Sequence, residues 1–231
     1  PAFIVDPVSV DEYEPEARLS GLPELPRICL SHALNSKAVA RKIAAELGKP
    51  YTSVNLIVAH LGTGISVSAH RQGRMIDVNN GQEDGPFAPD RNGGLPTRSL
   101  INLCFSGEYT RAQLLSRIMG SGGMYAYLGT KDIREAEQRA TQGDSHADLV
   151  LRAMTYQIAK EIGAMATVLA GQVERIVLTG GMAHSKRMVE DISVRVGFIA
   201  PIIVSPGEEE LSSLAAGALR VLRHAEASQV Y

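Results

Sequence analysis

The spacing of apolar residues along the chain predicts an alternation of helices and strands. Val39, Ile43 and Leu47 recur every four positions, as on one face of a helix, and the same spacing runs from Met154 to Leu169. Short apolar runs that end at glycine or polar residues predict strands instead. The predicted helices span residues 36–47, 99–105, 110–119, 131–139, 146–169, 185–196 and 208–224, and the predicted strands span residues 2–5, 56–59, 65–70, 75–78, 175–179 and 198–204.

Strands that alternate with helices indicate an α/β fold. The strands predicted at 56–59 and 65–70 are joined by residues 60–64, with the sequence His-Leu-Gly-Thr-Gly. Apolar and polar residues alternate in the second of these strands, which predicts one covered and one open face. The glycines let the connection turn tightly, and amides exposed in such a turn form a concave site for an anion such as phosphate. A plain hairpin turn is the alternative.

A second glycine pair follows the strand predicted at 175–179. Gly180 and Gly181 precede a predicted helix, where backbone amides can receive a phosphate or a ribose. An ordinary strand-to-helix turn is the alternative. The loop at 79–97 is rich in Gly, Asp, Asn and Pro, and a loop of this length is usually functional or mobile. Two arginines, Arg91 and Arg98, lie in it or directly after it.

Composition excludes several classes of protein. The chain has 231 residues, 45% of them hydrophobic, and a net charge of −2. We therefore expect a sizeable core and no extensive disorder. Without a basic block, the chain is not expected to bind nucleic acid. No apolar run is long enough to span a membrane, and no signal peptide is visible.

The spacing of cysteine, histidine and glycine excludes further sites. Cys29 and Cys104 form no C-x-x-C pair, so we expect free thiols in a reducing cytoplasm. The six histidines show no paired metal spacing, so a metal site built by protein ligands alone is not expected. The chain contains no G-x-x-x-x-G-K-[ST] loop and no G-x-S-x-G turn, and the third glycine of a dinucleotide fingerprint is missing after Gly64.

The string His60-Leu-Gly-Thr-Gly-Ile-Ser-Val resembles the second phosphate loop of the acetate and butyrate kinases. These enzymes form the acetokinase branch of the actin, sugar kinase and Hsp70 superfamily. The resemblance implies an actin/sugar kinase/Hsp70-like (ribonuclease H-like) fold that binds ATP or ADP with Mg²⁺. It also implies that His60, Gly62, Thr63 and Gly64 contact the nucleotide's phosphates.

Two further strings resemble the family's adenosine site. Gly180, Gly181 and Met182 match a motif in which strand residues lead into a glycine pair. Asp132 and Arg134 match an Asp-x-Arg pair that contacts the adenosine. An aspartate at the start of a helix also interacts favourably with the helix dipole, so Asp132 can serve either role or both.

Other positions match the family's catalytic groups. Asp6 corresponds to an aspartate on the acid and metal side of the site, and His32 to a histidine that contacts the transferring phosphoryl group. The string Pro-Asp-Arg91-Asn-Gly resembles the Pro-Glu-Arg-Ser-Gly of butyrate kinases, which favours Arg91 as the catalytic arginine. Arg98, within Thr-Arg-Ser, is the second candidate. Glu209 matches a glutamate near the magnesium, and Asp6 is a second metal candidate.

The resemblance implies reversible transfer of the γ-phosphoryl group of ATP to a short-chain carboxylate, which gives an acyl phosphate and ADP. The loop at 79–97 favours butyrate or a branched-chain acid, with acetate or propionate as alternatives. The family also implies a cytoplasmic homodimer or larger homo-oligomer. A non-catalytic nucleotide-binding module of the same fold is the other possibility, although a pure binder does not need Asp6, His32 and Arg91.

One family element has no counterpart in this sequence. The first phosphate loop, an Asn-Pro-Gly-Ser-Thr-Ser run, does not occur, and the family's usual length is greater by about 100 residues, the size of a small domain. We therefore expect residues 1–50 to be a remnant of the N-terminal domain and residues 51–231 to be the C-terminal nucleotide-binding domain. We also expect this chain alone to fold and to bind nucleotide without turnover.

Overall fold

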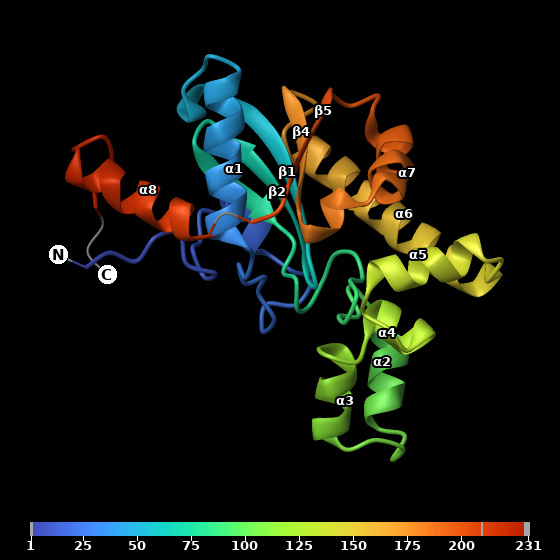
Figure 1. Ribbon diagram of the computed structural model, residues 1–231. Coiled ribbons are helices and arrows are strands. Elements are labelled where there is room, and N and C mark those ends of the chain that lie inside the picture. The colour runs from blue at the N-terminus through green and yellow to red at the C-terminus, as the bar shows by residue number, and fades with distance from the viewer. Residues whose placement is uncertain (1, 209, 229–231) are drawn as a thin grey trace.

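A computed structural model describes residues 2–208 and 210–228. Its centre is a five-stranded sheet in the order β3-β2-β1-β4-β5 (Figure 1). β1 (Asn55–Leu61), β2 (Ile65–Arg71) and β3 (Arg74–Val78) form an antiparallel meander. β4 (Arg175–Gly180) pairs with β1 in parallel, and β5 (Ile202–Pro206) pairs with β4 in parallel. The predicted α/β class is confirmed.

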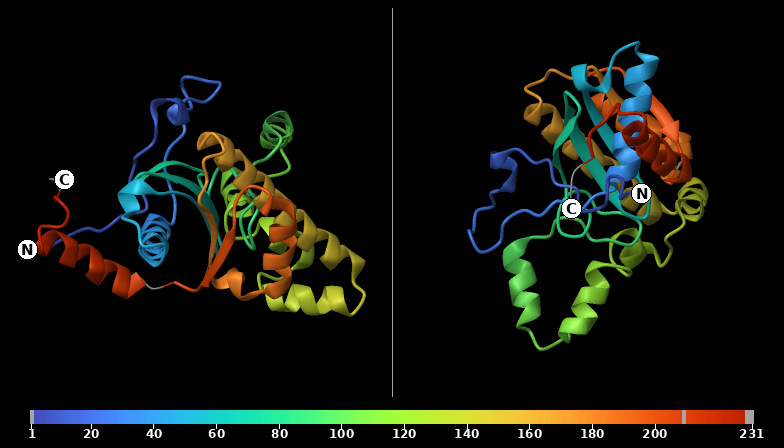
Figure 2. Two further views of the ribbon diagram at one scale, coloured as in Figure 1. Left: turned by 90° about the horizontal axis from the view of Figure 1, so that it is seen from above. Right: turned by 90° about the vertical axis from the view of Figure 1, so that its left-hand side faces the viewer.

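Helices cover both faces of the sheet. α1 (Ala33–Glu46) lies on one face, and α6 (Ser145–Val168) with α7 (Lys186–Val196) lies on the other (Figures 1 and 2). The larger apolar core fills the space between the sheet and α6, and a smaller core joins α1 to Leu56 and Val58 of β1. Because both faces are covered, the ends of the strands are the places where a ligand can meet the sheet.

The remaining helices extend from this centre. α2 (Thr97–Cys104) and α3 (Arg111–Ile118) project together from the body, followed by α4 (Gly123–Leu128) and α5 (Ile133–Thr141) (Figure 1). α8 (Glu210–Leu222) passes α1 and continues away from the sheet. Short 3₁₀ turns occupy Pro15–Arg18, Tyr51–Ser53 and Gly181–His184. Among the described residues, no helix has the length and apolar character needed to cross a membrane.

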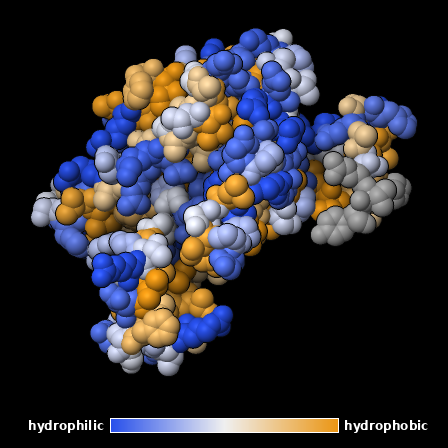
Figure 3. All heavy atoms as spheres, turned by 180° about the vertical axis from the view of Figure 1, so that it is seen from behind, coloured by the Kyte–Doolittle hydropathy of each residue, from blue (hydrophilic) through white to orange (hydrophobic). Residues whose placement is uncertain are grey.

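The projecting pair α2 and α3 carries apolar side chains into solvent. No residue of α2 is buried, and Phe105 at its end is 87% exposed. Ile101, Leu115 and Met119 are exposed as well. Seen from behind, apolar atoms gather on this pair at the bottom of the molecule (Figure 3).

Several predicted boundaries are wrong, each for a local reason. The helix predicted from residue 36 begins at Ala33, because His32 takes the N-cap position. The strand predicted from residue 198 begins at Ile202, and Phe198 lies 87% exposed in the preceding loop. Residues 2–5 form no strand, and Ile4 is 72% exposed. α4 was not predicted, because it begins within the glycine run at 120–123.

The prediction that β2 has one open face is also wrong. Its polar residues Ser66, Ser68 and His70 are all fully buried, because α1 and the segments around it cover that face. Ser68 Oγ donates to the Val58 carbonyl oxygen at 3.1 Å and lies 2.8 Å from His70 Nε2. The Tyr51 hydroxyl lies 2.6 Å from His70 Nδ1. Tyr51 thus donates to the histidine, which donates to Ser68, so each buried polar group has a partner.

Residues 2–50 pack onto the sheet rather than around a core of their own. Tyr13, Cys29 and Ala33 share a cluster with Met75 and Val78 of β3. The predicted domain boundary at residue 50 stays a prediction.

The buried histidine generates a prediction about stability and pH. Burial, with smaller contributions from Lys37 and Arg41, lowers the pKa of His70 from 6.5 to about 3. The unfolded chain therefore binds a proton that the folded chain does not, and stability falls as the pH drops from about 6.5 toward 3. His70→Leu should lower the free energy of unfolding at pH 7.5 by about 1–3 kcal/mol, because the Tyr51 hydroxyl loses its acceptor.

The same variant lacks the histidine that titrates. The stability difference between the natural chain and His70→Leu should therefore narrow by about 2 kcal/mol between pH 6.5 and pH 5. Urea denaturation at both pH values measures this difference. His184→Leu, at an exposed position, serves as the control and should change stability by less than about 0.5 kcal/mol. A difference that stays constant with pH would contradict the prediction.

Candidate active site

The carboxyl ends of β1, β4 and β5 meet at one edge of the sheet. His60 of β1 pairs with Thr179 of β4, and Gly180 pairs with Pro206 of β5. Gly180 has φ +86°, and a Cβ atom there would lie 2.5 Å from the Leu61 carbonyl oxygen. Glycine therefore allows β4 to end directly against the end of β1. In open α/β sheets, ligands bind beyond the carboxyl ends of the strands, so this edge is the candidate site.

The loop between β1 and β2 closes on itself at this edge. The Gly62 amide donates to the Gly64 carbonyl oxygen at 3.1 Å, and Thr63 is exposed at the tip. A Cβ atom on Gly62 would lie 3.0 Å from His60 Nε2, and one on Gly64 would lie 2.4 Å from Arg91 Nη1. A side chain at either position would therefore press on one of these neighbouring side chains. The loop lies between an imidazole on one side and a guanidinium on the other.

Arg91 is held in place by a glycine-rich segment from another part of the chain. The Asp90 carbonyl oxygen accepts from the Gly120 amide at 2.8 Å. Gly123 has φ +58°, and a Cβ atom there would lie 1.9 Å from the Ala88 carbonyl oxygen. Only glycine fits at this contact. The Arg91 side chain donates to a carbonyl oxygen of the 79–97 loop, that of Gly81, at 3.3 Å, which fixes the guanidinium over Gly64.

Two histidines stack beside the loop. The rings of His32 and His60 lie 4.1 Å apart and nearly parallel, and His32 Nδ1 lies 2.9 Å from Ser66 Oγ. Burial and then the charge of Arg91 lower the pKa of His32 to about 4. Burial and then His32 lower the pKa of His60 to about 3. Both rings are therefore neutral at pH 7.

Both nitrogens of His60 lie close to an oxygen atom, although a neutral ring can donate a hydrogen bond from only one of them. Nδ1 lies 3.0 Å from Asn35 Oδ1, and Nε2 lies 3.1 Å from a Glu208 carboxylate oxygen. Asn35 stands in the first turn of α1, and its Oδ1 is also 3.5 Å from the Thr179 hydroxyl. Sequence reasoning missed Asn35, Ser66 and Glu208 as site residues. Glutamates occupy residues 208–210, and the sequence favoured Glu209 among them.

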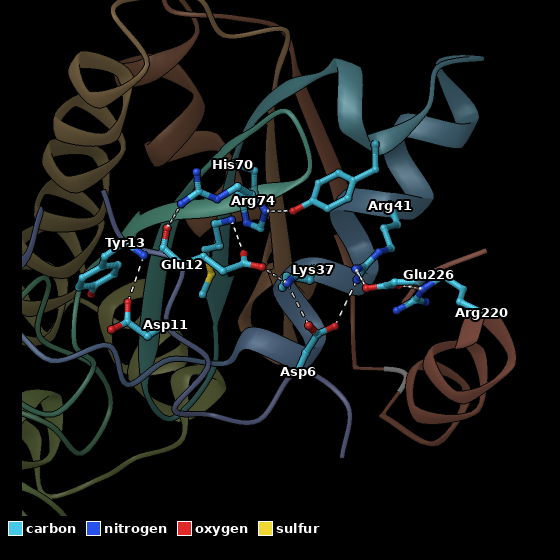
Figure 4. Close-up of polar contacts among 12 residues, drawn as sticks. Asp6, Asp11, Glu12, Tyr13, Lys37, Arg41, His70, Arg74, Arg220 and Glu226 are labelled. Carbon is cyan, nitrogen blue, oxygen red and sulfur yellow. Dashed lines mark hydrogen bonds and ion pairs between the residues drawn. The ribbon is translucent and has the colours of Figure 1, made fainter. Parts of the chain in front are cut away.

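Asp6 belongs to a separate ion cluster. Its carboxylate pairs with Lys37 at 3.0 Å and with Arg41 at 3.2 Å (Figure 4). Lys37 is buried and also pairs with Glu12 at 2.7 Å. Lys37 and Arg41 lie one to three turns further along α1 than His32. No contact joins Asp6 to His32, His60 or Arg91 in the part of the chain that the structure describes.

The predicted adenosine segments lie near one another. Asp132 is the N-cap of α5, accepts a hydrogen bond from the Arg134 amide at 2.9 Å and pairs with the Arg134 side chain at 2.7 Å. These hydrogen bonds lower the pKa of Asp132 to about 2. Further along α5, Glu137 accepts from the Ser185 hydroxyl, which follows the turn at 180–184. Met182 in that turn is buried.

The candidate arginine Arg98 lies away from the loop. Arg98 is exposed in the first turn of the projecting α2 and makes no hydrogen bond or ion pair with the described residues. Glu209 lies outside the described residues. Within residues 2–208 and 210–228, no group of three or more His, Cys, Asp or Glu side chains is placed to bind a metal ion.

Comparison with known proteins identifies the class and then the family. The fold is that of the actin, sugar kinase and Hsp70-like proteins, as the sequence predicted, and it is similar to three solved kinase structures. Acetate kinase of Porphyromonas gingivalis matches with a TM-score of 0.84 and 22% identity, over 94% of this chain and 63% of that one. Residues 29–203 match the acetokinase family, so the chain belongs to that family.

The other two structures give the same picture of the fold. A propionate kinase of Francisella tularensis matches with a TM-score of 0.78 and 19% identity, over 88% of this chain and 60% of that one. Acetate kinase of Entamoeba histolytica matches with a TM-score of 0.77 and 17% identity, over 90% of this chain and 63% of that one. This chain thus spans less than two thirds of each of the three.

The close approach of β4 to β1 generates a prediction about stability. Gly180 has φ +86° and ψ 175°, a conformation open almost only to glycine. Gly180→Ala should lower the free energy of unfolding by about 1–3 kcal/mol through backbone strain, with a further loss from the clash with Leu61. Urea denaturation measures the change.

The next residue provides a matched control. A Cβ atom on Gly181 would meet nothing within 4 Å, so Gly181→Ala should change stability by less than about 0.5 kcal/mol. Equal effects of the two substitutions would contradict the account of the β1–β4 contact.

Proposed function

We propose that this chain carries the nucleotide-binding and phosphoryl-transfer groups of a carboxylate kinase. The reaction is reversible transfer of the γ-phosphoryl group of ATP to a short-chain carboxylate, butyrate or a branched-chain acid, which gives an acyl phosphate and ADP. One observation carries the proposal: the Arg91 guanidinium lies against Gly64, beside the stacked rings of His32 and His60. Membership of the acetokinase family supports it.

The proposed mechanism rests on positioning and charge. The loop amides at 63–64 and the fixed guanidinium of Arg91 would stabilise the negative charge of the phosphoryl group in the transition state, whereas the Gly62 amide is taken by the Gly64 carbonyl oxygen. His32, neutral and held by Ser66, offers its other ring nitrogen to the same group. The acceptor carboxylate is already ionised at pH 7, so no strong general base is required.

The acidic segment at 208–210 supports a role for Mg²⁺. The Glu208 carboxylate reaches His60 at the phosphate loop, so Glu208 lies near the place where phosphates would lie. Mg²⁺ in phosphoryl-transfer sites is held mainly by phosphate oxygens and water with one or two carboxylates. Glu209, or its neighbour Glu208, would supply such a carboxylate, and the ion would neutralise phosphate charge. The Asp6 carboxylate pairs with Lys37 and Arg41, and its role on the acid and metal side of the site stays a prediction.

Two alternatives remain testable. Acetate or propionate is supported as acceptor by the names of the similar structures. A non-catalytic nucleotide-binding module would not need Arg91 and His32 at the loop. Hydroxamate detection of acyl phosphate, with butyrate, isobutyrate, propionate and acetate compared in parallel, separates these possibilities. Absence of acyl phosphate with every acid, in a protein of full natural length that binds ADP, would favour the binding module.

Location and assembly complete the proposal. Cys29 is a buried free thiol and Cys104 an exposed one, which fits a reducing cytoplasm. The apolar side chains exposed on α2 and α3 favour a homodimer or a larger homo-oligomer.

The role of Arg91 generates a prediction about turnover. In the protein at its full natural length, Arg91→Ala should lower kcat by about 10³–10⁵, because an arginine that acts on the transition state contributes that much. ADP affinity should change far less, because other groups hold the nucleotide. Arg91→Lys should not restore the rate, since an ammonium lacks the planar fork of the guanidinium.

Arg98→Ala is the matched control and should leave kcat and ADP affinity unchanged, because Arg98 is exposed on α2. Acyl phosphate production and calorimetry measure the two quantities, and circular dichroism checks that each variant folds. A large loss in Arg98→Ala with little loss in Arg91→Ala would show that the wrong arginine was chosen.

The two roles of Asp132 can be separated by its conservative variant. Asparagine caps helices as well as aspartate does, so Asp132→Asn should leave the stability of the chain unchanged. If the carboxylate binds the adenosine, ADP affinity should fall by about tenfold, the effect of losing one charge-assisted hydrogen bond. Calorimetric titration of the 231-residue chain with ADP measures it.

Arg134→Ala should weaken ADP binding similarly, although its side chain is 90% exposed and contributes little to the fold. Arg152→Ala provides the control, because Arg152 is also an exposed arginine paired with an aspartate, Asp148. If Asp132→Asn and Arg134→Ala bind ADP as tightly as Arg152→Ala does, Asp132 and Arg134 do not belong to the adenosine site.

A further inference from the structure

The side chain of Asn35 lies where α1 meets the carboxyl ends of two strands. Its Oδ1 is 3.0 Å from Nδ1 of His60, the last residue before Leu61 ends β1. The same oxygen is 3.5 Å from the hydroxyl of Thr179, the residue before Gly180 in β4. One amide oxygen therefore contacts both the strand that leads into the phosphate loop and the strand that leads into the predicted adenosine turn.

This contact determines which nitrogen of His60 carries hydrogen. With the amide oxygen of Asn35 toward His60, Nδ1 is the donor, because an amide oxygen only accepts hydrogen bonds. The other nitrogen, Nε2, is the one that faces the loop, because a Cβ atom on Gly62 would lie 3.0 Å from it. His60 is 1% exposed and stacked on His32, so its ring has little freedom to turn by itself. The hydrogen bond to Asn35 fixes the rotation of the imidazole ring about the bond that joins it to Cβ.

We propose that Asn35 is a positioning residue of the phosphate loop, which fixes the orientation and tautomer of His60 and ties that ring to Thr179 at the start of the adenosine turn. Asn35 does not touch the loop glycines. It acts through His60. A hydrogen bond to one ring nitrogen of a histidine fixes which nitrogen carries the hydrogen, and so determines whether the other nitrogen donates or accepts. Its effect on nucleotide binding rests on the proposed function, whereas its effect on the ring does not.

The proposal makes a specific statement about the loss of Asn35. With the amide oxygen gone, the remaining partner of His60 is the Glu208 carboxylate beside Nε2, at 3.1 Å. A neutral ring that has only this acceptor gains by placing its hydrogen on Nε2. The tautomer should therefore switch in Asn35→Ala and persist in Asn35→Asp, which keeps an oxygen beside Nδ1.

Nitrogen NMR of the histidine-labelled chain at pH 7.5 without nucleotide tests this directly. The His60 signals are assigned from a His60→Gln variant that lacks them. We expect hydrogen on Nδ1 in the natural chain and in Asn35→Asp, and on Nε2 in Asn35→Ala. Lys42→Ala, at an exposed position of the same helix, is the control and should resemble the natural chain.

Calorimetric titration with ADP then tests the functional part. Asn35→Ala should bind ADP about tenfold more weakly than the natural chain and Lys42→Ala, as expected for one lost hydrogen bond. A natural chain that does not bind ADP would contradict the proposed function and leave the NMR result standing. A switch of tautomer without any change in ADP affinity would contradict the coupling between His60 and the nucleotide.

Two NMR outcomes would overturn the proposal. Hydrogen on Nε2 in the natural chain would mean that the Asn35 amide is turned over and donates to His60. An unchanged tautomer in Asn35→Ala would mean that Asn35 serves only the packing of α1. If Asn35→Ala does not fold, the natural chain and Asn35→Asp still test the proposal. Hydrogen on Nε2 of His60 in either of them would contradict it.

Discussion

The structure depends on hydrogen-bond partners for the polar side chains on one face of the buried strand β2. β2 lies within a sheet covered on both sides, yet Ser66, Ser68 and His70 lie on one of its faces. An unpaired polar group in such a place costs about 1–3 kcal/mol, so each requires a partner. Ser68 and His70 find theirs in Val58 and Tyr51, and Ser66 contacts His32 at the start of α1. The contact that satisfies Ser66 thus places His32 beside the loop between β1 and β2.

The site also depends on two places where backbone segments approach each other closely. Gly180 lets β4 end against Leu61, and Gly123 lets the segment after α3 press against Ala88 and so hold the loop of Arg91. In both places a side chain would collide with a carbonyl oxygen. Gly180, which the sequence predicts to belong to the adenosine turn, is therefore also the residue that permits β4 to end against β1. Its structural role and its predicted functional role are not alternatives.

The sequence predicted the class of fold and most elements because long helices and buried strands have strong periodicity. It could not predict the buried face of β2, since alternating polar residues normally signal solvent. The loop histidine His60 and Arg91 were found from strings of neighbouring residues, and the structure brings them together. Asn35 was not predicted as a site residue, because its contact with His60 joins residues 25 positions apart. Asp6 was chosen by the same resemblance, and its ion pairs with Lys37 and Arg41 could not be predicted from neighbouring residues, because both partners lie more than 30 positions away in α1.

The charges at the loop indicate what the ligand must bring with it. Among the described residues, Arg91 is the cation that contacts the loop, while burial keeps both stacked histidines neutral at pH 7. A nucleoside di- or triphosphate carries several negative charges, and Glu208 adds another beside His60. One guanidinium and a few amides do not balance this charge in a partly buried site. If the proposed nucleotide binds here, a metal ion that arrives with it would supply the missing positive charge, and the carboxyl group of Glu208 would favour such an ion over a bare phosphate.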